Sequence, residues 1–211
     1  MNWPQTVVIA ALGAVVAVSI ALSMGAGRSG DPATAAPAQP AERPKPAAMP
    51  GATDPAAMEW LKAGAGIWDA QITFWFRPGM DPVHTKAICT AEMDLDGMFL
   101  RQRFEGGDFG PVRPGATWTS VSYTGFNPST KQYEAVRMAS TNSTMIVVRG
   151  KLDGAGKVLT LSGEYQMAGM ASTHRDVITQ ISADERRVES FMKFGDTPEF
   201  KGAEMILTRR K

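Results

Sequence analysis

This chain of 211 residues contains one cysteine and two histidines. A single cysteine, Cys89, cannot form an internal disulfide, and we expect it to be a small buried apolar side chain. Two histidines exclude most metal sites and most catalytic triads. The motifs H-E-x-x-H, G-x-S-x-G and C-x-x-C are absent as well. The sequence therefore predicts no metal and no cofactor, and it leans away from an enzyme.

The chain also lacks an excess of charge of either sign. Its 22 Lys and Arg residues nearly balance 21 Asp and Glu residues, which leaves a net charge of +1. The charges are interspersed, and nothing resembles the basic stripe that nucleic-acid binding requires. We therefore expect no nucleic acid as a partner.

Residues 6–26 form a run of twenty-one residues without one charged side chain. As a helix rising 1.5 Å per residue, this run would span about 30 Å, the thickness of a bilayer core. The preceding MNWPQT has no Lys or Arg, whereas a cleavable signal usually begins with basic residues. We expect 1–27 to be a separate hydrophobic helix that anchors the protein in a membrane. A cleaved signal peptide, with Gly25 or Gly27 at the cleavage site, is the alternative.

Residues 28–53 form a linker, and residues 54–211 form one domain. The stretch 31–50 holds six prolines and seven alanines, so it lacks the apolar surface that a fold must bury. Its prolines favour an extended spacer. The sequence thus predicts a cell-envelope protein. Its domain stands in the periplasm or outside on an anchor, or it is secreted to the periplasm.

Turn signals divide the domain into short, regular pieces. Asp54 followed by Pro55 is typical of a helix start and predicts a short helix over 54–62. Hairpin-type turns occur at 94–97, 127–131, 153–157 and 183–186. Ten strand-like runs follow the helix: 66–77, 86–95, 98–105, 117–126, 131–140, 144–151, 157–167, 172–182, 186–194 and 203–209. A long antiparallel meander removes its edges by closing, so the sequence predicts an all-β, up-and-down barrel.

Alternation along the strands indicates what the barrel encloses. The first strand places one apolar face toward the expected interior, made of Trp68, Ala70, Ile72, Phe74 and Phe76. Two other strands mix polar and apolar side chains on one face: Trp118, Ser120, Ser122, Thr124 and Phe126, and Tyr133, Ala135, Arg137 and Ala139. A barrel of eight to ten strands has room for a small ligand, which mixed faces would suit. The alternative is that the polar faces are simply the outside.

Several segments together resemble a known family. They are G-x-W at 66–68, FWFRPG at 74–79, GMFLRQRFEG at 97–106, TGFNPSTKQY at 124–133, LTLSGEY at 159–165 and EFKGAEMILTRRK at 199–211. In this order they resemble the bacterial family called domain of unknown function 1579, over nearly the whole domain. The resemblance implies a lipocalin-like (calycin) barrel and no established activity. After Tyr133, family members tend to have an aromatic residue and then an acid, where this chain has Arg137 and Ala139.

We select Arg137 as the main charge of a ligand site. A buried guanidinium can bind a carboxylate at two points, and Arg137 shares its face with small alanines. It would need an anionic partner, either Glu164, Glu189 or the acid group of a ligand. The other arginines considered are Arg101, Arg103, Arg149 and Arg175. The predicted ligand-binding residues are Arg137, Trp68, Phe74, Phe76, Tyr133 and Trp118.

The two histidines lead to different hypotheses. His84 lies in PVHTK, where we expect a solvent-exposed loop residue. We interpret His174 as a polar strand residue with ordinary hydrogen bonds. A haem ligand is the alternative, because the nitrobindins, a related calycin barrel type, hold haem through one strand histidine.

Three functions remain open at this point. The first is a binding module for a small apolar or amphipathic ligand, which could carry an anionic group. The second is a solid barrel that contacts an envelope partner through its loops, with 106–115 and Phe109 as the natural contact. The sequence does not identify that partner. The third is an enzyme or haem protein that uses His174 or a carboxylate pair.

Overall fold

The computed structural model describes residues 54–108, 114–141 and 143–211. The expected anchor and linker, and the loop tip with Phe109, lie outside the described residues. Within those three ranges, no helix is long and apolar enough to cross a membrane.

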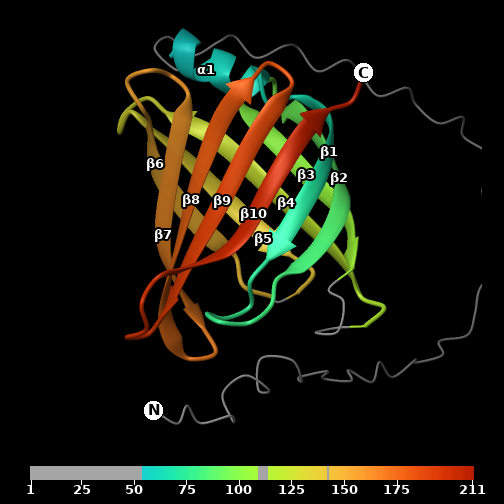
Figure 1. Cartoon of the computed structure of the whole chain (residues 1–211). Coiled ribbons are helices and arrows are strands. Elements are labelled where there is room, and N and C mark those ends of the chain that lie inside the picture. Colours follow the sequence, from blue (N-terminus) through green and yellow to red (C-terminus); the bar gives the residue numbers. More distant parts are fainter. Residues whose placement is uncertain (1–53, 109–113, 142) are drawn as a thin grey trace, which may run out of the picture. The chain divides into compact units, whose positions relative to one another are not determined.

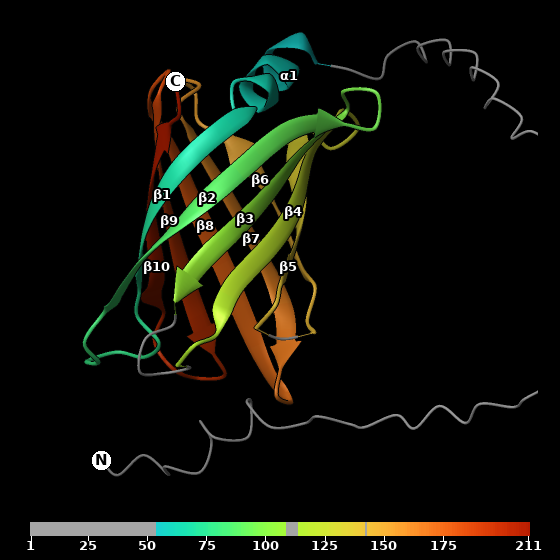
Figure 2. The ribbon, with the colours of Figure 1, turned by 90° about the vertical axis from the view of Figure 1, so that its right-hand side faces the viewer.

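The described residues form one helix and ten strands, and the strands close into an antiparallel barrel (Figures 1 and 2). Each strand pairs with its neighbours in sequence, and the first pairs with the last. The elements are α1 (Pro55–Lys62), β1 (Gly66–Phe74), β2 (Val83–Asp94), β3 (Phe99–Asp108), β4 (Thr117–Asn127), β5 (Gln132–Ala139), β6 (Ile146–Leu152), β7 (Val158–Met167), β8 (Met170–Ser182), β9 (Glu185–Phe194) and β10 (Phe200–Arg209). The predicted all-β, up-and-down barrel with one short helix is confirmed.

Several strand ends differ from the sequence-based expectation; β2 and β10, for example, each begin three residues earlier, at Val83 and Phe200. Strand β1 ends at Phe74 rather than continuing to Arg77, although Phe76 still packs against the core. Strands β7 and β8 are joined by the two residues Ala168 and Gly169, which both have positive φ (50° and 78°). This geometry matches the twist of a tight hairpin. Alanine rarely adopts it, so the sequence carried no strong signal for this turn.

The helix begins as predicted and closes one end of the barrel. The Asp54 side chain accepts hydrogen bonds from the backbone N–H groups of Ala56 (3.0 Å) and Ala57 (3.3 Å). Pro55 occupies the first turn, where no N–H is needed. Leu61 is fully buried, and the Tyr133 hydroxyl of β5 donates to the carbonyl of Ala57 at 3.3 Å. These contacts hold α1 against the barrel.

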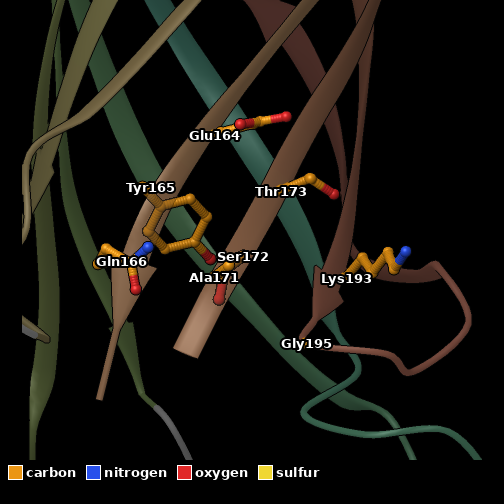
Figure 3. A pocket seen from close by; sticks show the side chains of 8 residues that line it. All are labelled: Glu164, Tyr165, Gln166, Ala171, Ser172, Thr173, Lys193 and Gly195. Atoms are coloured by element: carbon orange, nitrogen blue, oxygen red, sulfur yellow. The ribbon is translucent and has the colours of Figure 1, made fainter. Parts of the chain in front are cut away.

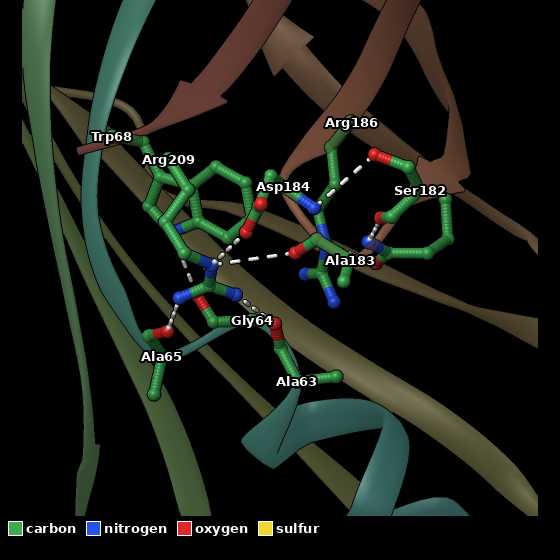
Figure 4. Close-up of polar contacts among 10 residues, drawn as sticks. Ala63, Gly64, Ala65, Trp68, Ser182, Ala183, Asp184, Arg186 and Arg209 are labelled. Atoms are coloured by element: carbon green, nitrogen blue, oxygen red, sulfur yellow. Dashed lines mark hydrogen bonds and ion pairs between the residues drawn. The ribbon is translucent and has the colours of Figure 1, made fainter. Parts of the chain in front are cut away.

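Two arginines and two tryptophans complete this closed end. The Arg186 guanidinium lies 5.0 Å from the centroid of Trp60 and 5.6 Å from that of Trp68, and Arg209 lies 4.1 Å from Trp68. Arg209 also donates to the carbonyls of Ala65 and Ala63, at 2.6 and 2.9 Å (Figure 4). Burial, with the charge of Arg209, lowers the pKa of Arg186 to about 10. Arg186 therefore stays protonated at neutral pH, inside an aromatic cage.

Aromatic rings gather at the opposite end, where β1 ends and β4 begins. The ring of Trp118 lies 5.8 Å from Phe74 and 5.5 Å from Phe104, measured between centroids. Phe76 adds to the cluster, 6.0 Å from Phe74. We call these four residues the aromatic cluster.

Strands β6 and β7 approach each other closely along a short ladder. Their register runs only from Arg149 to Leu152 on β6. Beyond it, a Cβ atom on Gly163 of β7 would lie 2.0 Å from the carbonyl oxygen of Val147. That distance is shorter than any real contact, so the approach requires glycine at this position.

We predict that Gly163→Ala lowers the free energy of unfolding by about 1–3 kcal/mol, because backbone atoms must move to admit the methyl group. Gly154, in the β6–β7 turn, faces open space and serves as the control. Gly154→Ala should change stability by less than about 1 kcal/mol. Urea unfolding followed by tryptophan fluorescence measures both, and equal effects would contradict the prediction.

Candidate functional site

An ion pair crosses the interior of the barrel. Nη2 of Arg137, on β5, lies 2.9 Å from Oδ2 of Asp176, on β8. Strands β6 and β7 stand between these two strands in the sheet, so the two side chains meet only through the interior. Asp176 is fully buried and the Arg137 side chain is 26% exposed. Arg137 thus points inward, and solvent reaches it there.

Two further polar groups contact the Asp176 carboxylate. Its Oδ1 accepts a hydrogen bond from the Ser190 hydroxyl at 2.5 Å and lies 3.0 Å from Nε2 of His174. Burial alone would raise the pKa of Asp176. The positive charge of Arg137 and the hydrogen bonds from His174 and Ser190 outweigh burial and hold this pKa at about 2. Asp176 is therefore ionised at neutral pH, and its charge balances that of Arg137.

Three polar atoms of this group have no hydrogen-bond partner. They are Nε of Arg137, Nδ1 of His174 and Oδ2 of Asp176, and all three atoms are buried. Oδ2 is close to the Arg137 guanidinium but is not aligned for a hydrogen bond. A buried polar atom without a hydrogen-bond partner lowers the stability of the fold by roughly 1–3 kcal/mol, so nearly all such atoms in native proteins have a partner. We call Arg137, His174, Asp176 and Ser190 the polar cluster.

Small side chains line the inner face beside Arg137. Ser122 on β4 lies opposite Arg137 in the register, and Ser120 lies opposite Ala139. Ala135 precedes Arg137 on the same face of β5. The mixed face predicted from the sequence is thus inside the barrel, beside a charged residue and with few bulky groups.

A pocket of about 360 Å³ lies beside the β7–β8 hairpin (Figure 3), at the end of the barrel away from α1 (Figure 1). It is lined by Glu164, Tyr165, Gln166, Ala171, Ser172, Thr173, Lys193 and Gly195. Two of these residues, Tyr165 and Ser172, are buried and pair across β7 and β8. Ser172 is followed on the same face of β8 by His174. The lining also includes exposed residues such as Glu164 and Lys193, so the pocket opens on the outer surface at this end, and no residue of the polar cluster lines it.

The surroundings of His174 bear on the haem alternative. The parts of the chain that the structure describes contain no group of three or more His, Cys, Asp or Glu side chains able to hold a metal ion. His174 is buried, with Nε2 beside Asp176 and Nδ1 unoccupied. Its interpretation as a hydrogen-bonded strand residue agrees with these contacts. The haem alternative stays a prediction.

The six residues predicted to bind a ligand fall into three groups. Trp68 and Tyr133 pack into the closed end beside α1. Phe74, Phe76 and Trp118 belong to the aromatic cluster at the other end. Arg137 lies between them, in the polar cluster. The structure therefore does not gather the six around one centre, and their role in binding stays a prediction.

The expected partner of Arg137 was wrong. Glu164 is exposed on the outer face of β7, and Glu189 pairs with Lys201. The alternation of side chains along β7 and β9 places both carboxylates on the outer face. The carboxylate that pairs with Arg137 is that of Asp176. His84 is solvent-exposed as expected, but it lies on β2 rather than in a loop, with Nδ1 3.1 Å from Oγ1 of Thr73.

The other candidate arginines form outer ion pairs. Arg101 pairs with Glu92, Arg103 with Glu105, Arg149 with Glu134 and Arg175 with Glu199. Cys89 is fully buried, as predicted, and burial raises the pKa of its thiol to about 12.

Sequence reasoning missed Asp176, Ser190 and Arg186. Along β8 the two faces are equally mixed: His174, Asp176 and Ile178 alternate with Arg175, Val177 and Thr179. Neither set is clearly the apolar one, so alternation could not tell which face is buried. One signal was available. Asp176 follows His174 by two residues and therefore lies on the same face of β8, and His174 was already a candidate residue.

We predict that Arg137→Ala lowers the free energy of unfolding by about 3 kcal/mol, because Asp176 would stay buried without its counter-charge. Replacing both partners, as Arg137→Met with Asp176→Leu, should recover most of the loss. The control is Arg103→Ala, whose partner Glu105 is more than half exposed, and it should cost less than about 1 kcal/mol. Chemical denaturation compares the three, and an Arg137→Ala loss no larger than the control's would contradict the prediction.

Comparisons with known proteins agree with this architecture. The chain resembles the crystal structure of Rv2717c from M. tuberculosis, with a TM-score of 0.55 and 17% identity, over 75% of this chain and 99% of that one. It also resembles the S-type phycobiliprotein lyase CPES from Guillardia theta, with a TM-score of 0.52 and 11% identity, over 72% and 92%. At these identities the likeness is one of fold. A search of the curated proteins finds no match. The family model described as protein of unknown function (DUF1579) matches residues 54–209, and the chain belongs to that family.

Proposed function

We propose that the barrel is a binding module for a small amphipathic molecule. The polar end of this ligand meets the polar cluster. Its apolar part lies along the inner face of β4 toward Trp118 and the aromatic cluster. Ser122, beside Arg137, and Trp118 are four positions apart on this face, which corresponds to about 13 Å of strand.

The unfilled atoms of the polar cluster carry this proposal. A barrel that served only as a solid scaffold would gain stability by pairing or replacing its buried polar groups. Here Nε of Arg137 offers a proton donor and Nδ1 of His174 a donor or an acceptor, whereas Oδ2 of Asp176 already faces the Arg137 guanidinium. A ligand with a carbonyl, carboxyl or hydroxyl end satisfies such a set. The small side chains beside Arg137 and the 26% exposure of the Arg137 side chain support access to it.

The proposed ligand class is tested with decanoate and decanol, added to the purified protein in isothermal titration calorimetry. The paired variant Arg137→Met with Asp176→Leu keeps an interior of similar volume but removes the polar cluster's charges. It should bind decanoate at least tenfold more weakly, a difference of about 1.4 kcal/mol. The control variant Arg103→Met with Glu105→Leu removes an exposed ion pair of the same chemistry and should bind like the wild type.

Two results would contradict the proposal. One is that neither probe binds wild-type protein, and the other is that the paired interior variant binds both probes unchanged. Native mass spectrometry of freshly purified protein adds an independent readout, because an amphipathic ligand retained from the cell adds its mass to the folded chain.

We also propose that the barrel acts in the cell envelope, which rests on the uncharged run at 6–26 and the proline-rich stretch behind it. Protease added to spheroplasts should digest the barrel, whereas a variant without residues 1–27 should stay protected inside the cell. The intact mass of the native protein separates an anchor from a cleaved signal. Full protection of the native barrel would contradict this location.

A further inference from the structure

We propose that the site takes up a carboxylic acid ligand together with one proton, and that His174 holds this proton. The inference rests on the proposed function and specifies its ligand and its regulation. It follows from the balance of charges inside the barrel. Arg137 and Asp176 contribute one charge of each sign at 2.9 Å, so the pair is neutral before any ligand arrives.

A carboxylate cannot enter this site as a bare anion without cost. Arg137 is already paired with Asp176, whose buried Oδ2 lies 2.9 Å from Nη2 of the guanidinium. A second carboxylate would bring a like charge next to the fully buried Asp176, and buried carboxylates that share a site hold a proton between them. Binding of an acid therefore requires a further positive charge.

His174 is the group placed to supply that charge. The inner-face residues around His174 on its own strand and on both neighbouring strands are Ser172, Asp176, Ser190, Met192, Gly163 and Tyr165. From β5, Arg137 reaches the same carboxylate that His174 contacts, that of Asp176. Of these, Asp176 is ionised and Arg137 is charged, and burial raises the pKa of Tyr165, which keeps its hydroxyl neutral. A histidine side chain ordinarily changes its charge between pH 5 and 8.

The hydrogen bonds of His174 suit a protonated ring. With a proton on each nitrogen, Nε2 donates to Oδ1 of Asp176, at 3.0 Å in the structure. Nδ1, which is buried and unpartnered, then donates to the carboxylate of the ligand. The unfilled Nε–H of Arg137 donates to the same group. Each unfilled donor of the polar cluster gains an acceptor, and the total charge of ligand, Arg137, Asp176 and His174 is zero.

The experiment is calorimetric titration of the full-length protein with decanoate and with decanol, repeated near pH 7 in buffers of different ionisation enthalpy. We expect decanoate to bind with uptake of up to one proton and decanol with none. The affinity for decanoate should rise up to tenfold per pH unit as the pH falls from 8 to 6, because the bound state holds the extra proton. The affinity for decanol should stay constant over this range.

The variant His174→Gln tests where the proton resides. Glutamine keeps a hydrogen-bonding amide near Asp176 but does not titrate, and urea unfolding confirms that the variant is folded. We expect it to lose the proton uptake and the pH dependence with decanoate, and to bind decanol with an affinity that, as in the wild-type protein, does not depend on pH. A variant that fails to fold is replaced by His174→Asn with the same readouts.

The outcomes separate this inference from the proposed function. Decanoate binding without proton uptake, or uptake that persists in His174→Gln, overturns the role of His174 and leaves the binding module standing. Failure of both decanoate and decanol to bind wild-type protein overturns the binding module and this inference with it.

Discussion

Closure of the sheet is the constraint on which the rest of this structure depends. When β1 pairs with β10, every strand gains two neighbours, and each inward side chain enters one shared interior. Arg137 and Asp176 stand on strands that are not neighbours, yet closure brings them to 2.9 Å. Without it, each would be a charged residue on one face of an open sheet, where water could solvate it.

The interior that results is divided along its axis. At one end, Arg186 and Arg209 stack on tryptophan rings beneath α1 and seal the barrel. At the other end, Phe104 and Trp118 pack with neighbouring rings. The polar cluster lies between these two packed regions, so its charges are shielded from water on two sides. The charge of any molecule that binds inside the barrel must therefore be compatible with the charges of the polar cluster.

Local signals explain why much of the fold was predictable. The N-cap at Asp54, the hairpin turns and the alternation along β1 each depend on neighbours in the chain. They therefore predicted the helix, the number of strands and the inward direction of Trp68. The same reasoning placed Arg137 inside, because it follows Tyr133 and Ala135 with a period of two residues. The two-residue turn at Ala168 was not predicted, because alanine rarely adopts the positive φ that this turn requires.

The sequence by itself determined the class of fold and the order of its strands, and it favoured an inward position for Arg137. Only the tertiary structure decided which acid faces this arginine, because Asp176 lies 39 positions away on a strand whose two faces are equally mixed. Local alternation carries no information about which strands meet across a closed barrel. The pairing of Arg137 with Asp176, and the unpartnered nitrogen of His174 beside it, follow from the closure of the barrel.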